Sequence, residues 1–367
     1  MFNNFYSGKR VLVLGHTGFK GSWLTLWLTK LGAKVSGASI GFPSEPCNFE
    51  VLGLQKKIDH SICDIRDFEK LKKVFEEKQP EIVFHLAAQA LVHDSYEDPK
   101  TTFDTNLGGT VNVLECIRTT ESVQTSIIIT SDKCYQNDEW VWGYRENDRL
   151  GGDDPYSASK ACAEIALHAY VQSFFKQSTG KKVLLASARA GNVIGGGDWA
   201  ENRIIPDCVK ALSEGGEPFV RNPYATRPWQ HVLEPLSGYL WLAVELSSNT
   251  ELHGESFNFG PNANVDKSVK ELLDTFLKYW GKGSWKYEKN STFKKEKTLL
   301  KLSCDKALAH LDWHATLTYE DTIQMVAEWY KAFYGGQEMI EFTAKQIDTY
   351  VDFAEKLDLS WAKGKDA

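Results

Sequence analysis

The chain has 367 residues, of which 42% are hydrophobic and 25% are charged, and its formal net charge is −7. This composition is ordinary for a globular protein and argues against a disordered or fibrous chain. The length suggests one large domain or two modest ones. The negative balance, without a basic cluster, gives no support to binding of nucleic acid or of an anionic membrane.

No run approaches the roughly 18 apolar residues that a membrane-spanning helix needs. Residues 1–6 lack a basic stretch followed by an apolar one, so the sequence predicts no secretory signal. The seven cysteines are scattered, with no C-x-x-C pair. We therefore expect reduced thiols in a cytoplasmic protein, with neither a disulfide framework nor a metal site.

Short apolar runs of strand type alternate with helical stretches in the first half of the chain. The expected strands are 10–14, 35–40, 60–65, 81–86, 126–130 and 183–188. The expected helices are 22–31, 68–77 and 108–119. This alternation indicates right-handed βαβ units. The predicted fold is α/β, a Rossmann-type doubly wound parallel sheet with helices on both faces.

The rhythm changes after the sixth expected strand, where glycines and prolines break the chain into shorter pieces. Residues 255–259 are expected to return as one more strand of the first sheet. The sequence thus predicts a first domain of residues 1–190 with about 230–260. A smaller, intertwined C-terminal domain would contain residues 191–229 and 261–360.

A glycine-rich loop joins the first expected strand to the first expected helix, with the spacing G-x-x-G-x-x-G. Glycines there permit a tight turn and let the backbone approach a pyrophosphate at the positive N-terminus of the helix. A plain glycine-rich turn is the alternative, but the strand–loop–helix setting favours a dinucleotide. The residues expected to contact it are Gly15, Thr17, Gly18, Phe19, Lys20 and Gly21.

The acidic residue expected about 20 positions later, which would hold the ribose hydroxyls, is missing. The second strand ends in residues 36–41, S-G-A-S-I-G, with no Arg or Lys either, so NAD is favoured over NADP. Asp64 and Ile65, after the third strand, could hold the adenine edge. The alternative for Asp64 is an N-cap of the helix that begins at Phe68.

A tyrosine and a lysine stand four residues apart, at Tyr156 and Lys160, on a predicted helix. Residues at this spacing share a helix face, so the ammonium can stabilise the phenolate and lower its pKa from about 10. Such a phenolate can take a proton from a sugar hydroxyl while hydride leaves for nicotinamide. Alone, the pair is common on exposed helices, but a dinucleotide loop earlier in the chain makes it specific.

Together these motifs resemble the extended branch of the short-chain dehydrogenase/reductase superfamily. In that family the Tyr–Lys pair works with a Ser or Thr at a strand end, and Ser131, after Thr130, matches that position. Asn106 matches the structural Asn of the family. The segment that lines the nicotinamide side in the family matches Leu86, Ala87 and Ala88.

Asp132 and Lys133 follow the serine and favour dehydratases, because an acid can protonate a departing hydroxyl. The alternative for Asp132 is a turn-forming residue. Within the branch the chain is most similar to the CDP-glucose 4,6-dehydratases. The matching segments are 15–24, 130–135, 139–146, 154–160, 189–199, 227–232 and 257–261.

The resemblance implies conversion of CDP-D-glucose to CDP-4-keto-6-deoxy-D-glucose, in deoxysugar and O-antigen biosynthesis, with NAD regenerated in each turnover. Tyr156 would take the proton of the 4-hydroxyl and Asp132 would protonate the departing 6-hydroxyl. Lys133 stands where related enzymes carry the carbon 5 base. It would have to be neutral, through burial or a nearby cation, or it would only orient the intermediate.

Three residues, Asn192, Arg203 and Arg227, fall where the branch binds the substrate diphosphate, and arginine meets phosphate oxygens bidentately. Surface salt bridges are the alternative for the arginines. Ser95 is expected near the hexose. The choice of cytidine rests on the resemblance only.

The branch commonly forms homodimers through helices that would lie in residues 98–118 and 157–178, so a homodimer or homotetramer is expected. The apolar candidates for that face are Leu107, Val111, Leu114, Ala169 and Phe174, and packing on the sheet is their alternative use. A nucleotide-sugar epimerase or reductase of the same fold is the other enzyme hypothesis. A non-enzymatic NAD-binding regulator is disfavoured, because Ser131, Tyr156 and Lys160 are all present.

Overall fold

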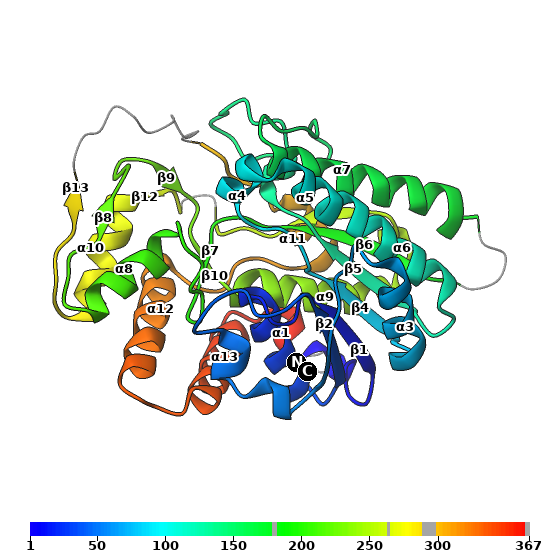
Figure 1. Cartoon of the computed structure of the whole chain (residues 1–367), viewed down its shortest axis with the longest axis horizontal. Helices are drawn as coiled ribbons and strands as arrows, with labels where there is room; N and C mark the ends of the chain where they lie inside the picture. Colours follow the sequence, from blue (N-terminus) through cyan, green and yellow to red (C-terminus); the bar gives the residue numbers. More distant parts are fainter. Residues whose placement is uncertain (178–181, 263–264, 288–298, 364–367) are drawn as a thin grey trace.

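A seven-stranded parallel sheet forms the centre of the computed structural model, which describes residues 1–177, 182–262, 265–287 and 299–363 (Figure 1). The order of its strands is β11-β6-β5-β4-β1-β2-β3. Their bounds are β1 (Arg10–Leu14), β2 (Lys34–Ser39), β3 (Asp59–Ile62), β4 (Ile82–His85), β5 (Thr125–Ile129), β6 (Leu184–Arg189) and β11 (Ser256–Asn258). The predicted α/β doubly wound sheet is confirmed, and the strand expected at 255–259 pairs with β6.

Both faces of the sheet are buried, as in doubly wound folds. Successive residues of β1 enter opposite cores, with Val11 and Val13 in one and Leu12 and Leu14 in the other. The first core also contains α1 (Phe19–Lys30) and α9 (Leu233–Ser248). The second contains α3 (Phe68–Lys78), α6 (Thr110–Thr119) and α7 (Pro155–Tyr170).

Short helical pieces connect these elements. They are α2 (Asn48–Val51), α4 (Val92–Glu97), α5 (Pro99–Phe103), the π-helix η3 (Asp104–Gly109) and the π-helix η5 (Val171–Phe175). Within the described residues, four 3₁₀ turns lie at Phe2–Asn4, Leu54–Lys56, Asp132–Cys134 and Thr250–Leu252. The helix expected at 108–119 therefore begins as π-helix before it continues as α6.

The structure also contains three two-stranded ladders, β10-β7, β12-β9 and β13-β8. The last two belong to a smaller region drawn on the left in Figure 1, and β10-β7 lies between that region and the large sheet. The strands of these ladders are β7 (Val193–Ile194), β8 (Phe219–Val220), β9 (Thr226–Arg227), β10 (Gln230–His231), β12 (Lys267–Ser268) and β13 (Lys286–Tyr287). The helices that follow in this part of the chain are α8 (Ile204–Ser213), α10 (Val269–Trp280), α11 (Asp305–Leu311) and α12 (Tyr319–Tyr334).

The last two helices, α13 (Met339–Lys356) and α14 (Ser360–Lys363), return to the start of the chain. The ring of Trp361 stacks on that of Phe2 at 5.2 Å between centroids and on that of Tyr350 at 5.5 Å. The predicted second domain, residues 191–229 and 261–360, includes α13, and α13 contacts α1 of the predicted first domain.

None of the described helices combines the length and apolar character needed to cross a bilayer. The seven cysteines are free thiols. Within the described ranges, no three His, Cys, Asp or Glu side chains gather where they could hold a metal ion.

The helix faces proposed for dimerisation are used in two ways. Leu114 lies in the second core against the sheet, which was the alternative use. Ala169 is exposed, and Phe174 is 48% exposed with the Arg118 guanidinium 5.6 Å from its ring centroid. The last residue of the range 157–178 lies outside the described residues.

Candidate active site

The functional loops meet at the carboxyl edge of the sheet, beside the neighbours β1 and β4. Strand order reverses there, since β2 and β3 lie on one side of β1 and the remaining strands lie on the other. Ligands of open α/β sheets bind in the crevice at such a switch point. The loops after β1, β4 and β5 all begin at this edge.

The glycine loop is shaped by close backbone approaches. Gly15 has φ +88°, and a Cβ built there would lie 2.7 Å from the backbone nitrogen of Ala87. A Cβ on Gly21 would lie 2.0 Å from the carbonyl oxygen of Gly15. Both positions therefore require glycine, and the loop touches the segment after β4 that sequence reasoning assigned to the nicotinamide side.

The N-terminus of α1 is suited to an anion. Its N-cap is Gly18, which offers no side-chain cap, and its first turn contains no acidic residue. A Cβ on Gly18 would meet only the Gly15 carbonyl, at 3.3 Å. The first amides of a helix have no intrahelical acceptor, so they are available to a pyrophosphate. These residues fit a dinucleotide.

Thr17 has a different use in this loop. Its hydroxyl donates to the Gly41 carbonyl at 2.6 Å and its amide donates to Ser39 Oγ at 3.4 Å. Thr17 therefore ties the glycine loop to the segment after β2.

The buried ring of His16 explains why the end of β2 lacks a large side chain. A Cβ on Gly37 would lie 2.3 Å from His16 Cγ, and His16 Nδ1 lies 3.1 Å from Ser39 Oγ. Burial lowers the pKa of His16 to about 4, so the ring is neutral at pH 7. The sequence showed that the ribose-binding acid is absent from the end of β2. It did not show that the His16 ring occupies the space beside Gly37.

Asp64 is held by Arg66. The Arg66 Nε and Nη2 atoms donate to Asp64 Oδ2 at 2.9 and 2.6 Å. Burial alone would raise the pKa of Asp64, but its hydrogen bonds with Arg66 bring the pKa below its usual value. The N-cap of α3 is Asp67, whose side chain accepts from Lys70 N, so the N-cap hypothesis for Asp64 was wrong. The carbonyl of Ile65 accepts from Asn112 Nδ2 at 2.9 Å.

Asn106 joins the segment after β4 to the helix α7. Its side-chain oxygen accepts from Gln89 N at 2.9 Å, and its amide donates to Gln89 O at 3.0 Å and to Ser159 Oγ at 2.9 Å. The half-buried Leu86, Ala87 and Ala88 precede Gln89. Asn106 thus fixes the distance between this segment and the helix that bears Tyr156.

Ser131 and Asp132 follow β5 and are buried, with Asp132 only 4% exposed. Ser131 Oγ donates to Asp132 Oδ1 at 3.0 Å. A Cβ on Gly191 would lie 1.9 Å from Asp132 Oδ2, so this glycine makes room for the carboxylate. Sequence reasoning missed that role, although the glycine follows directly after the sixth strand.

Tyr156 and Lys160 lie on the first turns of α7, which Asp154 caps by accepting from Ser157 N at 2.9 Å. Burial raises the pKa of Tyr156 to about 12, while a hydrogen bond with Ser131 acts to lower it. Burial lowers the pKa of Lys160 to about 8. Burial is therefore the largest influence on the pKa of Tyr156, and the expectation that Lys160 lowers it stays a prediction.

Lys20 and Arg203 add positive charge to this centre. Arg203 Nη1 lies 2.8 Å from Asp198 Oδ2, and its charge acts to lower the pKa of Tyr156. Burial lowers the pKa of Lys20 to about 8, with Arg203 acting in the same direction and Asp132 opposing it. Arg203, expected at the diphosphate, therefore also influences the tyrosine.

Four other expected site residues are Lys133, Ser95, Arg227 and Asn192. Lys133 is exposed, so it lacks the burial that a neutral base requires. Ser95 is fully buried, and its hydroxyl proton is used in a hydrogen bond to Val92 O within its own helix at 2.7 Å. Arg227 Nη1 donates to Thr226 O at 2.7 Å in β9. Asn192 has φ +52° next to Gly191.

A family model described as GDP-mannose 4,6 dehydratase matches residues 12–326. CDP-glucose 4,6-dehydratase from Salmonella typhimurium is 47% identical over 95% of this chain and 98% of that protein. UDP-glucose 4-epimerase from Mycoplasma pneumoniae is 25% identical over 89% of this chain and 98% of that protein.

Among solved structures, a double mutant of DesIV, a dTDP-glucose 4,6-dehydratase from Streptomyces venezuelae with NAD bound, superposes with a TM-score of 0.76. It is 21% identical, and the match covers 90% of this chain and 99% of that one. This likeness establishes a shared fold.

Proposed function

Because the chain belongs to the GDP-mannose 4,6 dehydratase family, the nucleotide-sugar dehydratases of the extended short-chain dehydrogenase group, we propose that it converts CDP-D-glucose to CDP-4-keto-6-deoxy-D-glucose. The buried juxtaposition of Ser131, Asp132 and Tyr156 supports this proposal most directly. It combines a hydroxyl pair suited to oxidation at carbon 4 with an acid suited to loss of water. The identity to the Salmonella enzyme supports cytidine as the nucleotide.

NAD is the proposed cofactor, bound by the glycine loop and the amides of α1. Its phosphates would meet Gly15, Gly18, Phe19, Lys20 and Gly21, at the uncapped helix N-terminus. Its other proposed contacts are Thr17, Asp64, Ile65, Leu86, Ala87, Ala88, Asn106, Thr130, Tyr156 and Lys160. When bound, the nicotinamide accepts a hydride from carbon 4 and returns it to carbon 6, so turnover has no net redox change.

In the first half-reaction Tyr156 takes the proton of the 4-hydroxyl. Burial raises its pKa to about 12, and the hydrogen bond with Ser131 acts to lower it. We propose that the Lys160 ammonium supplies the further stabilisation of the phenolate that this step needs. The Ser131 hydroxyl, which donates to Asp132 Oδ1 in the structure, would turn to donate to the carbonyl oxygen that forms at carbon 4. The resulting ketone acidifies the proton at carbon 5.

In the second half-reaction Asp132 donates a proton to the 6-hydroxyl, which leaves as water, while the carbon 5 proton goes to a base. Lys133 is the proposed base, and its exposed position makes that role depend on substrate covering the side chain. The alternative is that Lys133 orients the intermediate. A Lys133→Met variant separates the two roles. If Lys133 is the base, the variant still oxidises carbon 4 but no longer exchanges the carbon 5 proton with deuterated water.

Arg203, Arg227 and Asn192 are the proposed ligands of the substrate diphosphate. Arg203 lies at the edge of the catalytic centre and Arg227 lies in the β9-β12 ladder. A guanidinium in each place can meet phosphate oxygens bidentately. Ser95 stays a proposed contact of the hexose, for which its hydroxyl oxygen could act only as an acceptor while it donates to Val92 O.

The test is incubation with CDP-, dTDP-, GDP- and UDP-glucose, followed by identification of the products. The proposal requires a 4-keto-6-deoxy product, preferentially from CDP-glucose, with deuterium at carbon 4 of the substrate recovered at carbon 6. A product that retains its 6-hydroxyl and is inverted at carbon 4 would instead identify an epimerase. Absence of label transfer with all four sugars would refute the dehydratase proposal.

We also propose that the protein works in the cytoplasm as a homodimer or homotetramer. Seven free thiols are compatible with a reducing compartment. The exposed Ala169 and Phe174 on and after α7 offer an apolar face. Light scattering of the purified protein measures the oligomeric state.

A further inference from the structure

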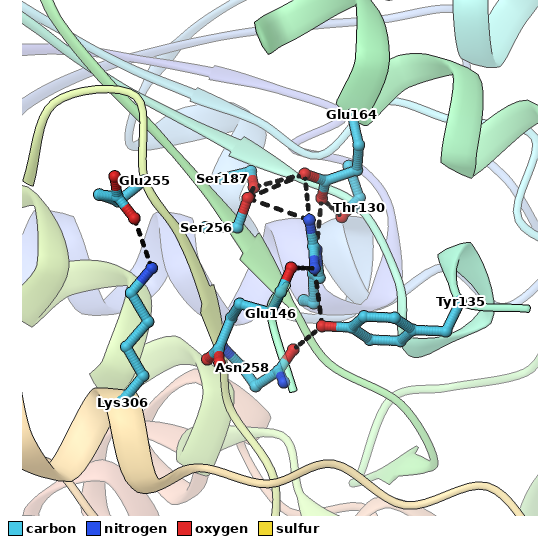
Figure 2. A network of polar contacts seen from close by, with 10 residues as sticks. Thr130, Tyr135, Glu146, Glu164, Ser187, Glu255, Ser256, Asn258 and Lys306 are labelled. Atoms are coloured by element: carbon cyan, nitrogen blue, oxygen red, sulfur yellow. Dashed lines mark hydrogen bonds and ion pairs between the residues drawn. The ribbon is translucent and has the colours of Figure 1, made fainter. Parts of the chain in front are cut away.

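A buried carboxylate lies on α7 one turn beyond Lys160. The side chain of Glu164 is 3% exposed, and so is that of Arg189, its ion-pair partner at the end of β6. Figure 2 shows the Glu164 carboxylate facing Ser187 and Ser256, with Thr130 beside it. None of these contacts takes part in the reaction as proposed above.

Glu164 accepts hydrogen bonds from three strands of the sheet. Thr130 Oγ1, just after β5, donates to Oε1, as does Arg189 Nε at 3.0 Å. Oε2 accepts from Ser187 Oγ at 2.8 Å, from Arg189 Nη2 at 2.8 Å and from Ser256 Oγ at 3.1 Å. A buried charge with five donors is well compensated, so the helix has one strongly preferred position on these strands.

The far side of Arg189 is equally constrained. Its Nη1 donates to Tyr135 Oη at 2.7 Å and to the Glu146 carbonyl at 3.0 Å. Tyr135 Oη in turn donates to Asn258 Oδ1 at 2.8 Å, on β11. Figure 2 follows this chain of contacts from Glu164 to Asn258. The guanidinium therefore cannot shift without breaking contacts to several segments.

Both members of the pair stand close along the chain to residues of the catalytic centre. Thr130 immediately precedes Ser131, and Lys160 stands four residues before Glu164 on the same helix. Two residues after Arg189 comes Gly191, the glycine that makes room for the Asp132 carboxylate. The position of the base relative to the acid thus depends on where this ion pair holds α7, β5 and β6.

We propose that Glu164, through its ion pair with Arg189, is a positioning residue that holds Tyr156 and Lys160 in register with Ser131. The inference rests on the proposed function for the identity of the reaction. Buried ion pairs are often no more stabilising than apolar packing, so a role in geometry accounts for the pair better than stability alone.

The charge of Glu164 also acts on Lys160. The groups that face Lys160 from the surrounding elements are Glu164 on α7, Cys134 after β5, His85 on β4 and Lys20 on α1. Glu164 and Cys134 favour the charged ammonium, whereas burial opposes it. Removing the carboxylate charge therefore lowers the pKa of Lys160, and the ammonium is lost at a lower pH.

The principal test is Glu164→Gln, measured with CDP-glucose across pH. We expect kcat to fall about 10²-fold with a much smaller change in KM, since an ångström of misplacement has an effect of that order. The alkaline decline of kcat should move to lower pH. A kcat and pH profile equal to those of the unaltered protein would overturn the proposal.

Glu234→Gln is the matched control. Glu234 is also fully buried, on α9, and accepts from the amides of Thr316 and Leu317 and from Tyr350 Oη. Its variant should lose thermal stability without moving the pH profile. A shift of the same size in both variants would mean that Glu164 is merely structural.

The double variant Glu164→Gln, Arg189→Gln removes both charges and leaves neither uncompensated. We expect it to regain stability relative to Glu164→Gln but to keep a low kcat, because the fork of hydrogen bonds is gone. Recovery of full kcat would show that an unpaired charge, and not lost positioning, caused the defect.

Failure of this inference is separable from failure of the proposed function. If the unaltered protein turns over another nucleotide sugar, the same comparison is made with that substrate. If it turns over none, crystal structures of the unaltered protein and of Glu164→Gln are compared to test the positioning role. An increase of more than about 0.5 Å in the Ser131 Oγ–Tyr156 Oη separation of Glu164→Gln supports positioning, and an unchanged separation overturns it.

Discussion

The two regions of the molecule hold their functional side chains in different ways. At the sheet edge, Ser131, Asp132, Tyr156 and Lys160 are all less than 9% exposed and are fixed by contacts with neighbouring strands and helices. In the smaller region, Arg227 lies on a two-residue strand and is only half-buried. Under the proposed function, the chemistry belongs to the closely packed sheet edge, here called the rigid region, and binding of the substrate diphosphate to the region of short ladders.

Tyr156→Phe should cause the largest loss. The variant keeps the ring and its packing but has no group to take the proton of the 4-hydroxyl, so kcat should fall about 10³-fold or more. Steady-state assays measure the loss, and bound NAD together with the melting temperature control for folding. Substantial remaining activity would remove the tyrosine from the rigid region's catalytic set.

Asp132→Asn should stop the reaction halfway. The amide keeps the shape of the side chain and cannot donate the proton that the 6-hydroxyl needs, so we expect oxidation at carbon 4 without elimination, about 10²-fold below normal turnover. Absorbance of reduced nicotinamide on mixing with substrate, together with product analysis, reports the two halves separately. Normal product formation would contradict the assignment.

Gly191→Ala tests how little space the rigid region has. A methyl group there would overlap the Asp132 carboxylate, at 1.9 Å, and something must shift. We expect a loss of about 1–3 kcal/mol in unfolding free energy and a lower rate of elimination. Gly108→Ala, where a Cβ meets nothing within 4 Å, is the control, and equal behaviour of the two would argue against crowding at Asp132.

Arg227→Lys should have the smallest effect of these variants, and it should change KM instead of kcat. Lysine keeps the charge but not the bidentate fork, so KM for the nucleotide sugar should rise about tenfold while kcat changes little. If kcat falls instead, the division between a chemical region and a recognition region is wrong.

Much of the sheet could be predicted because its strands are local apolar runs of residues. All six strands expected in the first half exist, with ends displaced by at most three residues, as for β3, which stops at Ile62. The glycine spacing and the four-residue separation of Tyr156 and Lys160 are equally local. Such features depend on neighbours along the chain, which a sequence displays directly.

The features that could not be predicted depend on partners far along the chain. Gly37 is required by the ring of His16, Gly191 by Asp132, and Glu164 by Arg189. The burial of Ser95 and the exposure of Lys133 likewise follow from tertiary packing, as does the high pKa of Tyr156. Sequence spacing alone contains no information on how much water each group loses.

The stacked rings of Phe2 and Trp361 have a consequence for how the chain is made. The Phe2 ring also contacts Tyr6 and Trp27, but the Trp361 ring that stacks on it is the last of these partners to be synthesised, so this part of the core stays incompletely covered during most of translation. Truncation after α12 would leave that surface bare, and the shortened chain should aggregate even though every catalytic residue is present.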